Sequence, residues 1–171
     1  LVANAWNHVA GVRNGNSLTI YVNGVAGQTV SVAGVTVSSP SGSTVKVSGY
    51  NNSTGVITGY VGSVRLVRGT AVYTGNFVPP SGPLPILPNT SLLLNFTNAG
   101  VIDSTGKNVI ETVGNSGVVT TTIKKYGSGS MFFDGTGDAV FVPSSNSINF
   151  QFHFLKNLQQ FPKNFQIFYN S

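Results

Sequence analysis

Two aspartates flank a short glycine-rich turn in Asp134-Gly-Thr-Gly-Asp138, the pattern of this sequence best suited to hold a metal ion. Calcium takes several oxygen ligands, from carboxylates, backbone carbonyls and water, at about 2.3–2.6 Å. The turn can supply carboxylate and carbonyl oxygens, and Asp103 or Asn108 can add others. We therefore predict Asp134, Asp138 and Asp103 as candidate ligands and calcium as a candidate cofactor. The alternative is a hairpin in which aspartate only favours the turn.

A second group of residues suited to binding lies in "SGYNNSTG", residues 48–55. There Tyr50 can stack on a sugar ring, while Asn51 and Asn52 can hydrogen-bond to sugar hydroxyl groups. Loops held by a rigid scaffold commonly carry the binding residues of a protein. We predict these three as candidate ligand-binding residues. The alternative is an exposed loop that binds nothing.

Residues that could support catalysis are few. The chain has four acidic residues in all, whereas a glycosidase needs two carboxylates about 5–5.5 Å apart for retention or about 6.5–9.5 Å apart for inversion. Glu111 stands alone in the sequence. His8 alternates with Trp6 and Ala10 and has no nucleophile or carboxylate partner near it in sequence, so we predict that it packs within a sheet. We expect no enzymatic activity.

The charge of the chain restricts the class of partner. Only 8% of the 171 residues are charged, against about 25% in a typical soluble domain. No basic cluster exceeds the pair Lys124–Lys125, so we expect no nucleic-acid partner. No apolar run approaches the roughly 18 residues of a membrane span, so we expect no membrane insertion. The absence of cysteine excludes a disulfide framework.

The hydrophobic pattern is that of β-strands. Apolar and polar residues alternate on both sides of "NGN" at 14–16, and Asn23-Gly24 favours a tight hairpin turn. Further strands are expected at 59–69, 91–96, 130–133 and 139–142. The pattern therefore predicts an all-β protein.

Two changes of composition suggest boundaries. Residues 79–88 hold five of the eight prolines, which predicts an extended linker at 81–90. From Gln151 the chain becomes rich in Phe, Asn, Gln and Lys, and this atypical tail, residues 151–171, is interpreted as a frame-shifted translation, with a helix or a disordered end as alternatives. Because the first residue is Leu1, we expect a fragment of a longer protein.

The run "WNHVAGVRNGNSLTIYVNG", residues 6–24, resembles the laminin-G-like, concanavalin A-like lectin/glucanase family, above all its repeats in phage virion and tail-fibre proteins. "GYVGSVRLVRGTAVYTGNFVPP" (59–80) resembles the end of such a module, and "SLLLNF", "DSTGKN" and "YGSGSMFFDGTGDAVFVP" resemble its start. The segments that resemble the end of a module therefore come before the segments that resemble its start, which is the reverse of the order in the family. We interpret residues 1–80 as the C-terminal half of one domain and 91–150 as the N-terminal half of the next.

This resemblance implies an antiparallel β-sandwich of jelly-roll, concanavalin A-like type, either incomplete or circularly permuted. It also implies adhesion or recognition, in some members with calcium. The leading expectation is a non-catalytic module of a repeat-containing protein at the extracellular or virion surface. Its partners would be a glycan or cell-surface receptor and neighbouring repeats. The alternatives are a purely structural fibre spacer and an accessory module of a glycoside hydrolase.

Overall fold

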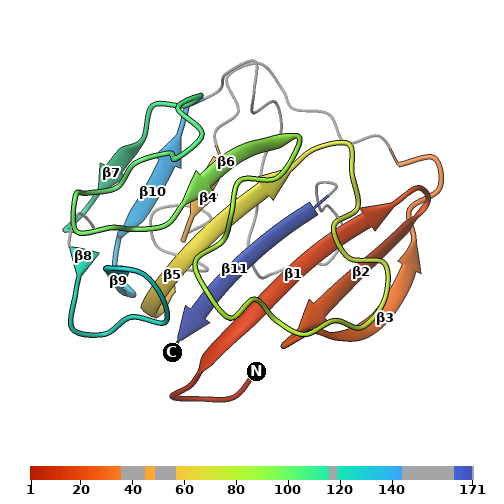
Figure 1. Cartoon of the computed structure of the whole chain (residues 1–171), viewed down its shortest axis with the longest axis horizontal. Coiled ribbons are helices and arrows are strands. Elements are labelled where there is room, and N and C mark those ends of the chain that lie inside the picture. The colour runs from red at the N-terminus through yellow and green to blue at the C-terminus, as the bar shows by residue number, and fades with distance from the viewer. Residues whose placement is uncertain (36–44, 49–56, 116–118, 144–163, 171) are drawn as a thin grey trace.

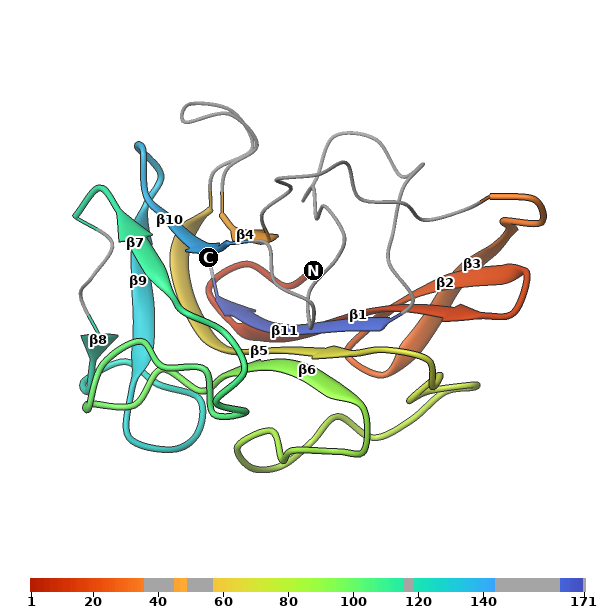
Figure 2. The ribbon, with the colours of Figure 1, turned by 90° about the horizontal axis from the view of Figure 1, so that it is seen from above.

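The computed structural model describes residues 1–35, 45–48, 57–115, 119–143 and 164–170. In these ranges the chain forms strands and turns, and every strand pairing is antiparallel. The strands make two sheets that face each other (Figures 1 and 2). The predicted all-β antiparallel sandwich is confirmed. The described ranges contain no helix long and apolar enough to cross a membrane.

The large sheet has the strand order β3-β2-β1-β11-β5-β9-β8, and β6 also pairs with β5. Strand β5 has room for both β6 and β9 on one edge, because β9 pairs with its first part and β6 with its last part. The strands are β1 (Trp6–Asn14), β2 (Ser17–Val22), β3 (Val25–Ser31), β5 (Thr58–Val67), β6 (Thr90–Leu94), β8 (Val119–Thr120), β9 (Ser130–Asp134) and β11 (Asn164–Asn170).

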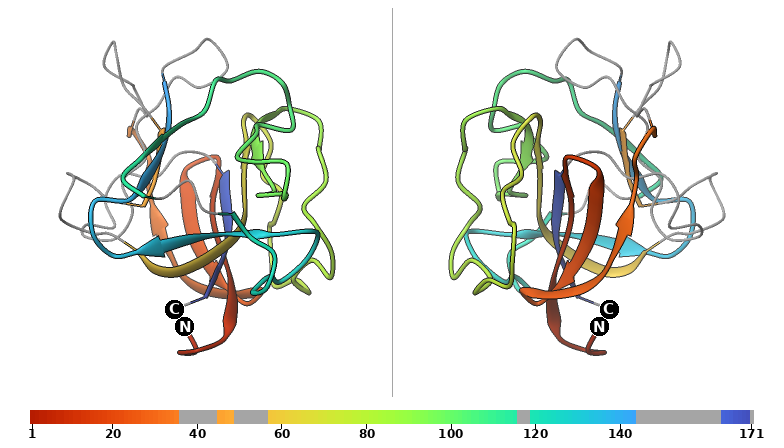
Figure 3. Two further views of the ribbon diagram at one scale, coloured as in Figure 1. Left: turned by 90° about the vertical axis from the view of Figure 1, so that its left-hand side faces the viewer. Right: turned by 90° about the vertical axis from the view of Figure 1, so that its right-hand side faces the viewer.

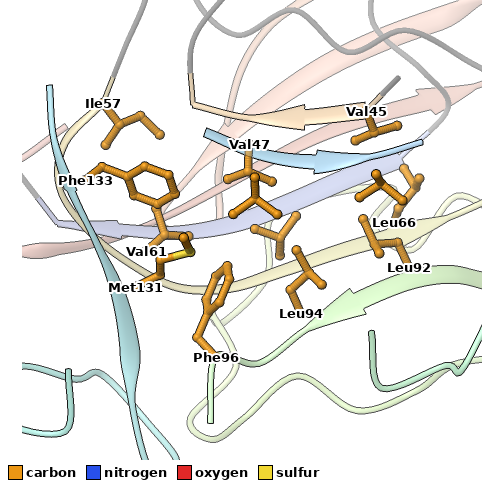
Figure 4. Close-up of a cluster of buried hydrophobic side chains, with 13 residues drawn as sticks. Val45, Val47, Ile57, Val61, Leu66, Leu92, Leu94, Phe96, Met131 and Phe133 are labelled. Atoms are coloured by element: carbon orange, nitrogen blue, oxygen red, sulfur yellow. The ribbon is translucent and has the colours of Figure 1, made fainter. Parts of the chain in front are cut away.

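The small sheet has the order β4-β10-β7 and covers one face of the large sheet. Its strands are β4 (Val45–Val47), β10 (Ala139–Val142) and β7 (Glu111–Val113). The main core fills the space between the sheets, because alternate residues of facing strands are apolar (Figure 4). Its members include Val47, Val61, Val64, Leu66, Leu92, Leu94, Phe96, Met131, Phe133, Val140 and Val142. Burial of each such side chain contributes about 1.5–3 kcal/mol.

The two segments on either side of the proline-rich stretch belong to one sandwich. Strand β5 pairs with β6 and β9, and β4 pairs with β10, so both sheets contain strands from before and after that stretch. Residues 164–170 of the atypical tail form β11, between β1 and β5. The derivation of the two segments from halves of successive repeats, and the frame-shifted origin of the tail, stay predictions.

The face of the large sheet that points away from the small sheet, here called the outer face, is partly covered by the connection between β5 and β6, residues 68–89 (Figures 2 and 3). Tyr73 and Phe77 of this connection stack at 3.5 Å between ring centroids. His8 meets both rings edge-on, at 6.0 and 5.4 Å. His8 is 1% exposed, so its predicted packing within the sheet is confirmed.

The Asn23-Gly24 turn joins β2 and β3 and contacts the connection. Asn23 has a φ of +50°, and its side chain accepts a hydrogen bond from the His8 amide at 2.8 Å and donates one to Asn7 at 3.1 Å. The Phe77 amide donates to the Gly24 carbonyl at 2.9 Å. Gly24 has a φ of +82°, and a Cβ at this position would collide with the Phe77 carbonyl. Glycine is therefore required here for both its conformation and its size.

The variant Gly24→Ala is expected to lower the free energy of unfolding by about 2 kcal/mol or more, because it adds a collision to the conformational strain. Gly15→Ala is the matched control, since Gly15 also has a positive φ, +60°, but its Cβ would meet nothing within 4 Å. Gly15→Ala should lower the free energy of unfolding by only about 1 kcal/mol. Urea unfolding followed by Trp6 fluorescence measures both values. Equal losses would contradict the close packing of the connection on Gly24.

Candidate functional site

The predicted loop residues Tyr50, Asn51 and Asn52 lie outside the described residues. Their assignment to ligand binding stays a prediction. The three aspartates predicted as calcium ligands are all described, and they lie in two different environments.

Asp103 is 4% exposed and accepts hydrogen bonds on both carboxylate oxygens. Its donors are the Leu93, Thr105, Lys107 and Asn108 amides, the Thr105 hydroxyl and the Asn108 side-chain amide, at 2.6–3.3 Å. Burial raises the pKa of the carboxyl group, but these hydrogen bonds outweigh it and leave the pKa below its usual value of 3.8.

The turn that begins at Asp103 satisfies the backbone of β6 on the edge that β5 does not occupy. Leu93 donates to Asp103, and the Ser104 amide donates to the Leu93 carbonyl at 2.7 Å. Lys107 Nζ donates to the Thr90 carbonyl at 2.6 Å, and the Asn108 side chain donates to the Ser91 carbonyl at 2.8 Å. Unpaired strand edges invite association with other chains. The turn at Asp103 thus covers an edge of the large sheet.

Asp134 and Asp138 are brought together at the turn between β9 and β10. Asp138 is 2% exposed, and its Oδ2 accepts a hydrogen bond from the Asp134 amide at 3.0 Å. The Asn115 amide nitrogen, when turned toward Asp138, lies 2.7 and 3.2 Å from its two carboxylate oxygens. Hydrogen bonds from the Thr136 hydroxyl and amide are the main cause of a lowered pKa at Asp134, with smaller effects from Asn115 and Asp138.

This pair forms an acidic turn at the end of the large sheet. Within the described ranges, no three His, Cys, Asp or Glu side chains form a group able to hold a metal ion. Two of the three predicted ligands therefore lie together, whereas the carboxylate of Asp103 binds backbone and side-chain donors of its own turn. Any calcium bound at Asp134 and Asp138 would have to complete its coordination with amide, carbonyl or water oxygens.

An aromatic pair lies beside the acidic turn. Tyr60 of β5 pairs with Phe132 of β9, and their ring centroids are 5.1 Å apart at 43°. The neighbouring residues Val61, Met131 and Phe133 point into the core. Because side chains alternate along a strand, Tyr60 and Phe132 lie on the outer face, where both are half-buried.

The aromatic pair and the acidic turn form one surface, which we call the outer-face site: Thr58, Tyr60, Phe132 and Asp134. Thr58 pairs with Asp134, two residues along the strands from Tyr60 and Phe132, so the four positions share one face. Partly exposed aromatic rings offer apolar area for stacking. The neighbouring hydroxyl and carboxylate can exchange hydrogen bonds with a polyhydroxylated ligand.

The sequence alone did not reveal the outer-face site. Tyr60 and Phe132 are far apart in the chain, and only the pairing of β5 with β9 brings them together. A usable signal was present in the alternation of each strand, since Tyr60 precedes Val61 and Phe132 lies between Met131 and Phe133. Aromatic residues at non-core positions of a strand can mark such a surface, but their partner strand cannot be read from the pattern.

The buried Arg65 belongs to the packing of the connection. Its Nη1 donates to the Pro85 carbonyl at 2.9 Å, and its side chain hydrogen-bonds with Tyr73. Burial lowers the pKa of the guanidinium group, and the interactions with Tyr73 partly offset that change. Arg65 is 3% exposed. It thereby anchors residues 68–89 to β5.

Comparison with known proteins gives one match. Residues 1–71 match the family model of the concanavalin A-like lectin/glucanases superfamily, which indicates a domain of that type. The match spans β1 to β5 and supports the resemblance drawn from residues 6–24 and from the part of 59–80 that precedes residue 72. No curated protein and no solved structure matches the chain.

The variant Asp103→Asn is expected to lower the free energy of unfolding at neutral pH by roughly 2 kcal/mol or more, because an amide replaces an oxygen that accepts several hydrogen bonds. The lowered pKa of Asp103 means that its ionised form stabilises the fold above about pH 4. This stabilisation is lost as the pH falls through the folded-state pKa, so the variant should show a smaller loss of stability on acidification.

Urea unfolding at pH values from 7 to about 2 tests this expectation. Glu111→Gln is the matched control, because Glu111 is an exposed carboxylate of β7. Equal acid sensitivity of the Asp103→Asn variant and the unmodified chain would contradict the account.

Proposed function

We propose that this chain is a non-catalytic, carbohydrate-binding module of a repeat-containing protein at the extracellular or virion surface. The outer-face site is the observation that carries this proposal. It combines two half-buried aromatic rings, Tyr60 and Phe132, with the hydroxyl of Thr58 and the carboxylate of Asp134.

A sugar ring has an apolar face of C–H groups and a rim of hydroxyl groups. Tyr60 and Phe132 would stack against the apolar face, which displaces water from both surfaces. Asp134 would accept hydrogen bonds from hydroxyl groups, and its lowered pKa keeps it ionised at neutral pH. The low overall charge of the chain suits a neutral sugar.

The acidic residues support a binding role rather than hydrolysis. Both carboxylate oxygens of Asp103 are engaged by its own turn, and the Asp138 carboxylate is engaged by Asn115 and the Asp134 backbone. A glycosidase needs two carboxyl groups that reach the scissile bond from opposite sides. Asp134 is the one acidic residue of the outer-face site.

Calcium is proposed as a stabilising ion at Asp134 and Asp138. The two carboxylates lie on one short turn, which would place a bound ion beside Tyr60 and Phe132. In this arrangement the ion would fix the turn and could bind sugar hydroxyls. The alternative is that Asp134 and Asp138 only stabilise the turn and bind no calcium. The calcium measurement below distinguishes the two.

The variants Tyr60→Ala and Phe132→Ala should each weaken glycan binding at least tenfold, equivalent to about 1.4 kcal/mol. Phe141→Ala is the matched control, since Phe141 is also half-buried but lies on the small sheet beside Lys46. A glycan array followed by calorimetric titration provides the measurement. Unchanged affinity in both site variants would contradict the outer-face site, and binding lost only in Tyr50→Ala would place recognition in the loop.

The thermal midpoint of the chain should rise in millimolar calcium relative to chelator, because an ion that binds only the folded state stabilises it. At 100 times the Kd the gain is about 2.7 kcal/mol. Asp134→Asn should remove the shift, whereas Glu111→Gln should retain it. A midpoint that is the same with calcium and with chelator would contradict the metal proposal while leaving glycan binding intact.

A further inference from the structure

His8 is a buried titratable residue that the proposed sugar site does not use. Its side chain lies on the outer face of β1, is 1% exposed, and contacts Tyr73 and Phe77 of the connection. Histidine is the side chain whose ordinary pKa, about 6.5, brings a change of charge between pH 5 and pH 8. A proton taken up by His8 would therefore place a positive charge beneath the connection.

The aromatic rings of the connection meet His8 with their rims. Tyr73 and Phe77 are parallel within 4°, with their centroids 3.5 Å apart. The imidazole is nearly perpendicular to both rings, and its centroid lies at nearly equal distances from theirs, 6.0 and 5.4 Å, so His8 lies beside the stack and not above it. The rim of an aromatic ring carries partial positive charge, whereas cations bind to its face. This contact therefore suits a neutral imidazole and disfavours an imidazolium.

The side-chain carboxylates of this chain do not lie beside His8. The sequence has four acidic residues, and all four are within the described ranges. Asp103 covers the edge of β6, Glu111 belongs to the small sheet, and Asp134 and Asp138 lie at the turn between β9 and β10. An imidazolium at His8 therefore gains no ion pair to offset the cost of placing its charge among apolar side chains.

The titratable and charged groups that face His8 are tyrosines and one arginine. Tyr73 contacts it from the connection, and Tyr21 of β2 lies 6.3 Å from Tyr73 between ring centroids. Arg65 of β5 hydrogen-bonds with Tyr73. Strand β11, beside β1, contains no charged residue, and its titratable Tyr169 pairs with the residue before His8. Because tyrosine is neutral below pH 7 and Arg65 is a cation, these groups also disfavour a protonated imidazole.

The part of the connection that covers His8, residues 69–80, has no strand of its own, and we call it the strap. It crosses the outer face over β1 and β2 (Figure 1). The Phe77 amide donates to the Gly24 carbonyl, and the Asn76 side chain accepts a hydrogen bond from the Ala26 amide, each at 2.9 Å. Segments outside regular secondary structure open at a lower cost in free energy than strands that are paired on both edges. The strap can therefore open while the sheets stay paired.

We propose that the strap is an acid-sensitive cover, and that protonation of His8 releases the stack of Tyr73 and Phe77 from β1 and β2 while both sheets stay intact. The open form takes up a proton that the closed form excludes. The closed form is therefore fully stable above about pH 6.5 and loses stability as the pH falls below that value. Release exposes the apolar side chains that the strap covers, which are Ala10, Val12 and Tyr21.

Amide hydrogen exchange of the full chain at pH 7 and pH 5, corrected for the intrinsic effect of pH on exchange, tests the strap. Exchange in peptides from residues 69–80 should be about tenfold faster or more at pH 5, because one proton taken up on opening changes the open population by up to about tenfold per pH unit. Peptides from β5 should keep their rates. Asp and Glu ordinarily titrate near pH 4, so the carboxylates contribute little in this range.

Substitutions at the two histidines of the chain assign the effect. His8→Phe keeps an aromatic ring but cannot take up a proton, so exchange in its strap should be the same at pH 7 and pH 5. His8→Leu is a second variant that does not titrate, and the thermal midpoint at pH 7 shows which of the two keeps the fold. His153→Gln is the matched control. It should retain the acid response, because His8 is then the one histidine of the chain.

Three results would overturn this inference. The first is strap exchange that is equal at pH 7 and pH 5 in the unmodified chain, and the second is an acid response that survives in a folded His8 variant or disappears in His153→Gln. The third is an acid response as large in β5 as in the strap, since the whole domain would then unfold. None of these results bears on sugar binding, which the variants at Tyr60 and Phe132 test separately.

Discussion

Strand β5 is hydrogen-bonded along both edges, and the strands on these edges come from distant parts of the chain. One edge carries β11, while the other carries β9 and β6. The inward side chains of β5, Val61, Val64 and Leu66, belong to the main core. Its outward side chains include Tyr60 and Arg65. Both faces of the sandwich therefore depend on the register of this strand.

The outer face is divided between a covered part and a partly exposed part. The connection of residues 68–89 covers β1 and β2 through Tyr73 and Phe77, and the Asn23-Gly24 turn and Arg65 hold it there. Trp6 lies at the boundary between the two parts, where it packs on Leu84 and Leu93. Beyond it, the aromatic residues are only half-buried. The connection thus buries the aromatic residues of one part of the outer face and leaves those of the other part half-exposed, where the proposed sugar ligand would bind.

Local patterns predicted much of this fold. The strands at 6–14, 17–22 and 139–142 and the Asn23-Gly24 turn follow from alternation and turn chemistry, and His8 lies in the sheet as expected. Asp103 shows the limit of such reasoning. Its sequence context, a polar turn, fits a metal ligand as well as a cap for a strand edge, and only the position of β6 distinguishes them.

The outer-face site could not be predicted because it depends on which strands are neighbours. The same holds for β11, which comes from the segment that composition set apart from the rest and yet lies between β1 and β5. Long-range pairing is determined by the sum of core packing and backbone hydrogen bonds, and no local pattern of residues encodes it. Tyr50, Asn51 and Asn52 illustrate the converse, since their residue types suggest binding but the sequence does not fix the geometry of their side chains.

We infer that β5 unites the segments before and after the proline-rich stretch in one cooperative domain. Trp6 reports on this union, because it comes from the first segment and packs against the cluster of Leu84 and Leu93, of which Leu93 belongs to the second. The most direct measurement is urea unfolding of the full chain followed at once by Trp6 fluorescence and by far-ultraviolet circular dichroism. If the two segments form one cooperative domain, both signals should show a single transition with the same midpoint. A fluorescence change completed well before the loss of strand signal would show two independent units and contradict the claim.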